Sequence, residues 1–188
     1  MKHLTEFEII ESVKRGNQTD FSLLIDLYKD RAYNLLKRML KNEMDAEEAL
    51  MDAFMKVYNS LPGFRYESKF STWFYKITYN TALTIISSKK RKTEKEMSSL
   101  EDHFDLQDGD DEIYAISEDS KIYLMNLVDK LPPRNALVLI LFYIDDLSLN
   151  EISQVLDLSL VNTKVMLHRS RNALRDMLLK HNYHEELL

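Results

Sequence analysis

The sequence has 188 residues, of which 45% are apolar and 30% charged, which is enough apolar material for a packed core and excludes a wholly disordered chain. The absence of Cys excludes disulfides, a thiolate metal site and a Cys nucleophile. No apolar run approaches the length of a membrane span and the N-terminus lacks a signal-peptide core, so we expect a cytoplasmic protein with no membrane insertion. With three Gly and three Pro, long helices are favoured over a turn-rich β fold, while a net charge of −6 argues against a nucleic-acid partner if it is evenly spread.

The negative charge is concentrated in one stretch. Residues 1–92 carry 16 Lys and Arg against 12 Asp and Glu, a net charge of +4. Residues 93–120 carry one against 11, a net charge of −10, and residues 121–188 carry eight of each. The acidic stretch lacks a strong apolar period, which indicates a flexible linker between two lobes. A solvated spacer without further function is the alternative for it.

The first two predicted helices begin at capping residues. Thr5 with Glu8 has the pattern of a capping box, and Gly16 can end this helix. Asp20 is a candidate cap for the second helix. The apolar residues of the second helix mostly recur every three or four positions, which predicts one buried face: Phe21, Leu24, Leu27, Tyr28, Leu35, Leu36 and Met39.

Two more helices and an aromatic loop complete the first lobe. Asp45 with Glu48 predicts the start of the third helix, and residues 61–63 (Leu-Pro-Gly) end it. Its predicted inner face is Ala49, Leu50, Ala53, Phe54 and Val57. Residues 64–72 are an aromatic and basic loop. A fourth helix follows from about Ser71 into the basic residues 89–92.

The second lobe is also predicted to be helical. Helices are expected at about 118–131, after the Pro pair at 134–144, and at 149–156 with a cap from Ser148 and Glu151. Residues 157–159 form a turn, and Ser159 can cap a long last helix. This order of a short helix, a turn and a longer helix is typical of a helix-turn-helix, with a predicted core of Ile152, Val155, Leu158 and Leu167.

Basic side chains follow one face of the last helix. Lys164, His168, Arg171 and Arg175 stand at i, i+4, i+7 and i+11. A cationic stripe beside a capped helix N-terminus suits a phosphate backbone, whereas the stripe alone is also what a solvated helix face shows. Together with the helix-turn-helix order, the stripe favours DNA binding.

Two sets of segments match the pattern of one known family: residues 45–54 and 70–77 with Asn80 in the first lobe, and residues 131–134, 147–152 and 164–171 in the second. They resemble bacterial extracytoplasmic-function (group 4) sigma factors of the sigma-70 family. The first set is similar to the promoter-melting lobe of that family and the second set to its second lobe. The resemblance implies a non-catalytic subunit that binds core RNA polymerase, recognises a two-part promoter and opens the duplex.

We therefore predict an all-α chain of two small helical domains joined by a flexible acidic linker. Residues 1–92 are the predicted promoter-melting and polymerase-binding domain, residues 93–117 the linker, and residues 118–188 the helix-turn-helix domain. By resemblance, the acidic linker threads the polymerase cleft.

The resemblance places capture of a flipped minus-ten base at residues 64–72. Stacking on an aromatic ring can offset the cost of extruding a base. The predicted contacts are Phe64, Arg65, Tyr66, Lys69, Phe70, Ser71, Thr72, Trp73, Lys76 and Asn80. Arg65, Lys69 and Lys76 would hold phosphates. Phe74 and Ile77 are assigned to the core, and for Trp73 a core role and a stacking role are both open.

Two further surfaces follow from the resemblance. The outer face of the third helix would dock on core RNA polymerase through Glu47, Glu48, Met51, Asp52 and Met55, with a solvated face as the alternative. The last helix would contact the minus-thirty-five element through Asn162, Lys164, Val165, Met166 and Arg169, with His168, Arg171 and Arg175 from the stripe.

The reading helix departs from the family pattern. Met166 stands where an Arg is frequent, and Val165 where a Ser is frequent. A bidentate Arg–guanine contact contributes about 1–3 kcal/mol of discrimination, which Met cannot supply. One hypothesis is that an accessory protein, either a DNA-bound activator or an RNA-guided DNA-binding protein, recruits this chain to its promoter. The alternative is that Val165 and Met166 recognise a different promoter motif.

Other classes of protein explain less of the sequence. A helix-turn-helix regulator that is not a sigma subunit accounts for residues 148–174 but not for the aromatic and basic segment at 70–77. His181, His184 and Glu185 have metal-like spacing but stand near the C-terminus, so no metal or other cofactor is expected. An anti-sigma factor is a further partner that the family resemblance admits.

Overall fold

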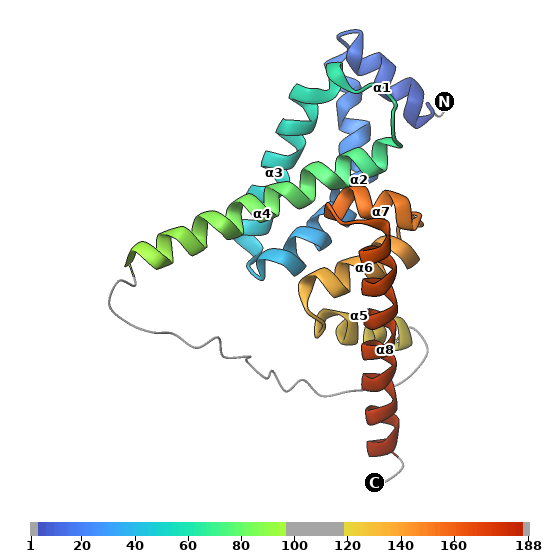
Figure 1. Cartoon of the computed structure of the whole chain (residues 1–188). Coiled ribbons are helices and arrows are strands. Elements are labelled where there is room, and N and C mark those ends of the chain that lie inside the picture. Colours follow the sequence, from blue (N-terminus) through green and yellow to red (C-terminus); the bar gives the residue numbers. More distant parts are fainter. Residues whose placement is uncertain (1–3, 97–118, 186–188) are drawn as a thin grey trace. The chain divides into compact units, whose positions relative to one another are not determined.

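The computed structural model describes residues 4–96 and 119–185, all of whose regular elements are helices (Figure 1). This confirms the all-α prediction. The elements before the gap are α1 (Glu6–Lys14), η1 (Gln18–Asp20), α2 (Phe21–Leu40), α3 (Glu43–Ser60), η2 (Leu61–Gly63) and α4 (Phe70–Glu96). Those after it are α5 (Asp119–Asp129), α6 (Pro133–Tyr143), α7 (Leu149–Leu156) and α8 (Leu160–Glu185).

Two compact units make up the chain. One takes in residues up to Ile86 together with Asn150–Leu158, and the other takes in Ser87–Leu149 and the residues from Ser159 onward. Helix α4 continues to Glu96, past the predicted boundary at residue 92, and most of the predicted linker lies outside the described residues. The predicted domain boundaries stay predictions.

Helix α1 has the ends that its sequence predicts. The Thr5 N–H donates to Glu8 Oε2 at 2.7 Å, and the Glu8 N–H donates to Thr5 Oγ1 at 3.3 Å, which is the predicted capping box. Gly16 adopts a φ of +100°, and its N–H donates to the Val13 carbonyl at 2.9 Å. Because residues with a side chain rarely adopt this φ, Gly16 ends the helix as predicted.

The caps of α2 and α3 agree only in part with the prediction. Asp20 stands at the N-cap position of α2, as predicted, but its side chain makes no capping hydrogen bond, because its carboxylate accepts hydrogen bonds from Ser12 Oγ at 2.5 Å and Asn17 Nδ2 at 3.0 Å and so ties α1 to η1. Helix α3 begins at Glu43, not at Asp45. Asn42 is its cap, and the Asn42 side-chain oxygen accepts the Asp45 N–H at 3.0 Å.

Aromatic side chains join α2, α3 and α4. The ring centroid of Phe74 on α4 lies 4.8 Å from the ring centroid of Tyr28 on α2 and 5.3 Å from that of Phe54 on α3. Phe74 is fully buried, as predicted, and Ile77 is half-buried. The predicted inner face of α2 is buried except at Leu27, whose side chain is 55% exposed and was assigned wrongly.

Helices α5, α6 and α8 share a second aliphatic core. Its buried residues include Leu127, Val128, Ala136, Leu137, Leu139 and Leu141. Pro133 occupies the first turn of α6, and the Pro132 carbonyl accepts the Ala136 N–H at 3.0 Å. Asn135 Nδ2 on α6 donates to Ser170 Oγ on α8 at 2.9 Å, which fixes these two helices against each other.

The turn between α7 and α8 is tight, as the sequence predicts. Asp157 adopts a left-handed φ of 53°, and the Asn162 N–H donates to Ser159 Oγ at 3.2 Å, so Ser159 caps α8. The bounds of α7 are those predicted. Ile152, Val155 and Leu167 are buried, as expected of core residues, whereas Leu158 is only half-buried.

The aromatic contacts predict where stability resides in the first four helices. Replacing Phe74 with Ala should lower the free energy of unfolding by about 3–5 kcal/mol, because a fully buried ring with neighbours on α2 and α3 is lost. Leu27→Ala, on the exposed side of α2, is the control and should cost less than about 0.5 kcal/mol. Urea unfolding followed by the fluorescence of Trp73, the single Trp in the sequence, measures both. Equal effects would contradict this account.

Candidate nucleic-acid interface

The predicted minus-ten contacts divide into buried and exposed residues. Phe64, Phe70 and Thr72 are 5%, 3% and 2% exposed. Ser71 and Trp73 are half-buried. The exposed members are Arg65, Tyr66, Lys69, Lys76 and Asn80. The structure thus brings the whole set to one loop and the first turns of α4, but only part of it is accessible to a partner.

The buried rings form a cluster at the base of the loop. Phe64 lies 5.0 Å from Trp73 and 5.7 Å from Phe70, measured between ring centroids. Phe70 also lies 5.4 Å from Tyr28 on α2. Because the rings of Phe64 and Phe70 are covered by protein, they anchor the two ends of the loop in this conformation. The rings with surface open to a base are those of Tyr66, which is 40% exposed, and Trp73.

One polar group behind the loop is unsatisfied. The hydroxyl oxygen of Thr72 is buried and has no hydrogen-bond partner within the described structure. The next Thr on α4 differs, since the Thr78 hydroxyl donates to the Phe74 carbonyl at 3.0 Å. An unpaired buried hydroxyl is uncommon in folded proteins. Among the predicted minus-ten contacts, Thr72 therefore has a buried hydroxyl whose hydrogen bonds are not made by the described structure.

Tyr66 contacts α1, which sequence reasoning missed. Its hydroxyl donates to Glu11 Oε1 at 2.7 Å, and its ring lies 4.5 Å from Lys14 Nζ. Burial and the Glu11 carboxylate raise the pKa of Tyr66 to about 12, and the Tyr66 hydroxyl lowers the pKa of Glu11. Glu11 and Lys14 are an ordinary i, i+3 pair in the sequence. Nothing local indicates that they reach a loop about fifty residues further on.

The predicted polymerase-binding face of α3 is exposed as a whole. Its five residues, Glu47, Glu48, Met51, Asp52 and Met55, all face solvent, and Met51 and Met55 are 64% and 59% exposed. The opposite face carries Ala46, Ala49 and Ala53, whose small side chains are fully buried. Met44, 79% exposed at the start of α3, is a further apolar residue that the sequence analysis did not include.

The first turns of α8 present the predicted reading residues. Asn162, Lys164, Val165, His168 and Arg169 are exposed and Met166 is half-buried. Thr163, Leu167 and Ser170 are buried on the opposite side. Val161 and Val165, 69% and 41% exposed, make this surface partly apolar. The exposed face therefore combines a few polar and basic groups with branched apolar side chains.

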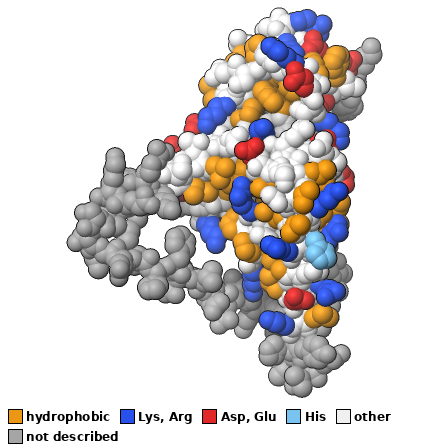
Figure 2. All heavy atoms as spheres, viewed as in Figure 1, with side chains coloured by type: hydrophobic (Ala, Val, Ile, Leu, Met, Phe, Trp, Pro, Cys, Tyr) orange, Lys and Arg blue, Asp and Glu red, His pale blue; other side chains and the backbone are white. Residues whose placement is uncertain are grey.

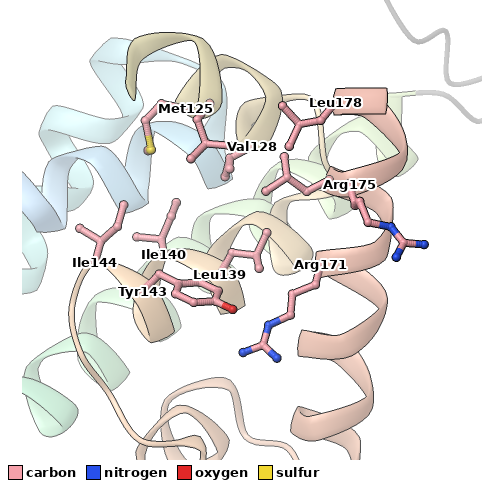
Figure 3. Close-up of a pocket in the computed structure, with 11 residues that line it drawn as sticks. Met125, Val128, Leu139, Ile140, Tyr143, Ile144, Arg171, Arg175 and Leu178 are labelled. Carbon is pink, nitrogen blue, oxygen red and sulfur yellow. The ribbon is translucent and has the colours of Figure 1, made fainter. Parts of the chain in front are cut away.

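Arg171 and Arg175 belong to a different environment from Lys164. The Arg171 guanidinium lies 5.3 Å and 5.2 Å from the ring centroids of Phe142 and Tyr143 on α6. Both arginines line an apolar cavity of about 390 Å³ between α5, α6 and α8. Figure 3 shows their guanidinium groups at its edge, away from Met125 and Val128. The predicted basic stripe is therefore divided into two parts.

Basic side chains outnumber acidic ones on the face of the molecule that Figure 2 shows. Lys and Arg side chains recur over the visible face, where Asp and Glu are sparse (Figure 2).

Within residues 4–96 and 119–185, no helix is long and apolar enough to cross a membrane, and no cluster of His, Asp and Glu has the arrangement of a metal site. The side chains of His181, His184 and Glu185 lie outside those that the structure describes.

Comparison with known proteins identifies similar regions over most of the chain. The family models Sigma-70 region 2 and Sigma-70, region 4 match residues 24–92 and 121–174. The ECF RNA polymerase sigma factor SigW of Bacillus subtilis (strain 168) is 35% identical over 178 residues, which are 90% of this chain and 94% of SigW. The ECF RNA polymerase sigma-E factor of Escherichia coli (strain K12) is 27% identical over 180 residues, 92% and 94% of the two chains.

Solved structures agree with these matches at the level of the fold. The sigma factor RpoE, in its co-crystal structure with the anti-sigma factor NepR from Bartonella quintana, aligns with a TM-score of 0.63 at 16% identity. The alignment covers 85% of this chain and 96% of RpoE.

Proposed function

The chain belongs to the ECF family of RNA polymerase sigma factors, and we propose that it directs promoter recognition and duplex opening without catalysing a reaction itself. The observation that carries this proposal is the presence of both sigma regions in one chain, in the order region 2 and region 4. A conventional helix-turn-helix regulator would account for the second match alone.

The loop at residues 64–69 is the proposed site of base capture. Extruding a base costs a few kcal/mol, and stacking on one aromatic ring returns roughly 1–3 kcal/mol. Since Phe64 and Phe70 are buried, Tyr66 and the accessible part of Trp73 supply the ring surface. This surface suits one base. Exposed Arg65, Lys69 and Lys76 carry the charge that phosphates require, and Asn80 follows on the exposed side of α4.

The proposed partners are core RNA polymerase, promoter DNA and an anti-sigma factor. The exposed methionines and carboxylates of α3 form an adaptable, acidic face that suits a basic helical surface of core polymerase. An anti-sigma factor is included because RpoE of Bartonella quintana is bound to one in its co-crystal structure.

The surface of α8 supports weak reading of the minus-thirty-five element. Met166 is half-buried and Val165 is exposed, so this part of the helix offers apolar contacts to thymine methyl groups in place of a bidentate Arg–guanine pair. Recruitment by a DNA-bound or RNA-guided accessory protein would compensate for that loss. Recognition of a different promoter motif through Val165 and Met166 is the competing explanation.

The proposed function is tested by run-off transcription. Purified core RNA polymerase and this chain are incubated with fragmented DNA of the same genome, and transcript 5′ ends are sequenced. Transcripts that appear only with the chain, downstream of a shared motif, are the expected result. Failure to bind core polymerase together with binding to duplex DNA would favour the regulator. Strong, site-specific initiation from these two components alone would reject the need for a recruiting protein.

The divided basic stripe of α8 makes a second prediction. Lys164→Ala should lower the salt dependence of holoenzyme–promoter binding by about one unit in the log–log slope, because one phosphate contact is lost. Arg171→Ala removes the same charge but should leave the slope nearly unchanged, since that guanidinium lies over Phe142 and Tyr143. Filter binding over a salt series compares the two variants. Equal reductions in slope would show that Arg171 also contacts phosphate.

The acidic linker is tested at its carboxylates. A polyanion can occupy a channel lined to hold nucleic acid and be displaced by the transcript. Replacing the Asp and Glu side chains between Asp105 and Glu112 with Asn and Gln should therefore slow initiation or promoter escape. Single-round transcription kinetics measure both steps. Unchanged rates would favour the solvated-spacer explanation.

A further inference from the structure

Two charged side chains of α1 bind the proposed base-capture loop. Lys14 Nζ donates a hydrogen bond to the carbonyl oxygen of Phe64 at 2.7 Å. The same ammonium lies 4.5 Å from the ring centroid of Tyr66, a cation–π distance. Glu11 accepts the Tyr66 hydroxyl at 2.7 Å and lies 3.4 Å from Lys14 Nζ. The four groups form one connected network between helix and loop.

The network holds Tyr66 in an unfavourable backbone conformation. Its φ of 59° lies in the left-handed region, which bulky side chains adopt rarely. Such a conformation persists only when its surroundings determine it. Tyr66 is fixed by its hydrogen bond to Glu11 and by two neighbouring rings, those of Phe7 and Phe64, whose centroids lie 5.3 Å and 4.8 Å from its own. Phe7 and Glu11 belong to α1, as does Lys14, whose ammonium lies over the Tyr66 ring.

We propose that Glu11 and Lys14 are positioning residues for base capture, which fix the loop at residues 64–69 so that Tyr66 presents its ring to an extruded base. This inference rests on the proposed function. Both residues precede residue 24, where the match to region 2 begins, so α1 becomes part of the promoter-opening machinery by its contacts alone.

The burial of Lys14 favours positioning over a direct phosphate contact. Its side chain is only 18% exposed, and its ammonium is already engaged with a carbonyl, a carboxylate and a ring. A loop that is ordered before DNA arrives does not pay that ordering cost on binding. Loss of the network should therefore reduce the selectivity of the loop for its base more than the stability of the helices.

Three variants break the network at different points. Lys14→Met removes the charge and the bond to the Phe64 carbonyl, Tyr66→Phe removes only the hydroxyl, and Glu11→Ala removes its acceptor. Arg15→Met is the matched control, because it deletes a cation from the exposed side of the same helix end. Glu11→Gln keeps a neutral acceptor for the hydroxyl and should therefore lose less than Glu11→Ala.

Each full-length variant is assembled with core polymerase and used to select from a randomised pool of single-stranded DNA. Preference for the motif enriched by the wild type over a scrambled strand should fall roughly tenfold in Lys14→Met and Tyr66→Phe, as expected for one lost bond to a charged group. Arg15→Met should match the wild type. Glu11→Ala combined with Tyr66→Phe should lose no more than Glu11→Ala alone, because Glu11→Ala already breaks the bond to the Tyr66 hydroxyl as well as the contact with Lys14.

The outcomes separate this inference from the function on which it rests. Unchanged preference in Lys14→Met and Tyr66→Phe, while the wild type enriches a motif, would overturn the positioning role alone. An equal loss of binding to selected and scrambled strands would also overturn it, since it would indicate a merely structural role. A wild-type holoenzyme that enriches no motif would overturn the proposed base capture itself.

Discussion

The packing of Phe74 against Tyr28 and Phe54 is the contact on which the first four helices depend. It places α4 across α2 and α3, with Phe70 one turn earlier in the same aromatic group. Phe70 in turn contacts Phe64, so the loop between them is anchored in the core at both ends. The intervening side chains then project outward. The geometry of the proposed base-capture loop is thus a consequence of core packing, and a weaker core would leave the loop without fixed ends.

Aromatic side chains in this region differ in burial, and the buried ones anchor the loop while the exposed one offers a contact surface. The side chains of Phe64 and Phe70 have no polar atom and are buried. The Tyr66 side chain carries a hydroxyl that donates to Glu11 on α1, and two-fifths of the surface of Tyr66 is exposed. A polar tip on an apolar ring suits the boundary between core and solvent. The buried rings therefore anchor the loop and the exposed ring provides a contact surface. The spacing of aromatic residues in the sequence does not distinguish these two roles.

Most features determined by neighbouring residues were predicted well from the sequence, although the start of α3 was not, since Asn42 and not Asp45 is its cap. The capping box at Thr5, the helix end at Gly16, the bounds of α7 and the cap at Ser159 all depend on residues within about four positions. The other prediction errors arose where a side chain had more than one possible partner, or where its partner was distant in the sequence. The Asp20 side chain at the N-cap of α2 accepts a hydrogen bond from Ser12 instead of making a capping bond, and Arg171 lies over rings from α6, about thirty positions earlier. Periodicity cannot rank such partners, because it carries no information about which helix packs where.

The two proposed DNA-contacting surfaces differ in how specificity can arise. On α8, the exposed N-terminal turns offer Lys164 and Arg169 beside apolar valines, and Arg171 is held over aromatic rings. On the proposed function, such a surface would offer few hydrogen-bond donors to base edges, and it would discriminate between bases only weakly. The loop of the first unit, by contrast, is anchored at both ends and held by α1. On the proposed function, selectivity then depends more on the preorganised loop than on the reading helix, and changes in α1 should alter promoter choice more than changes at Val165.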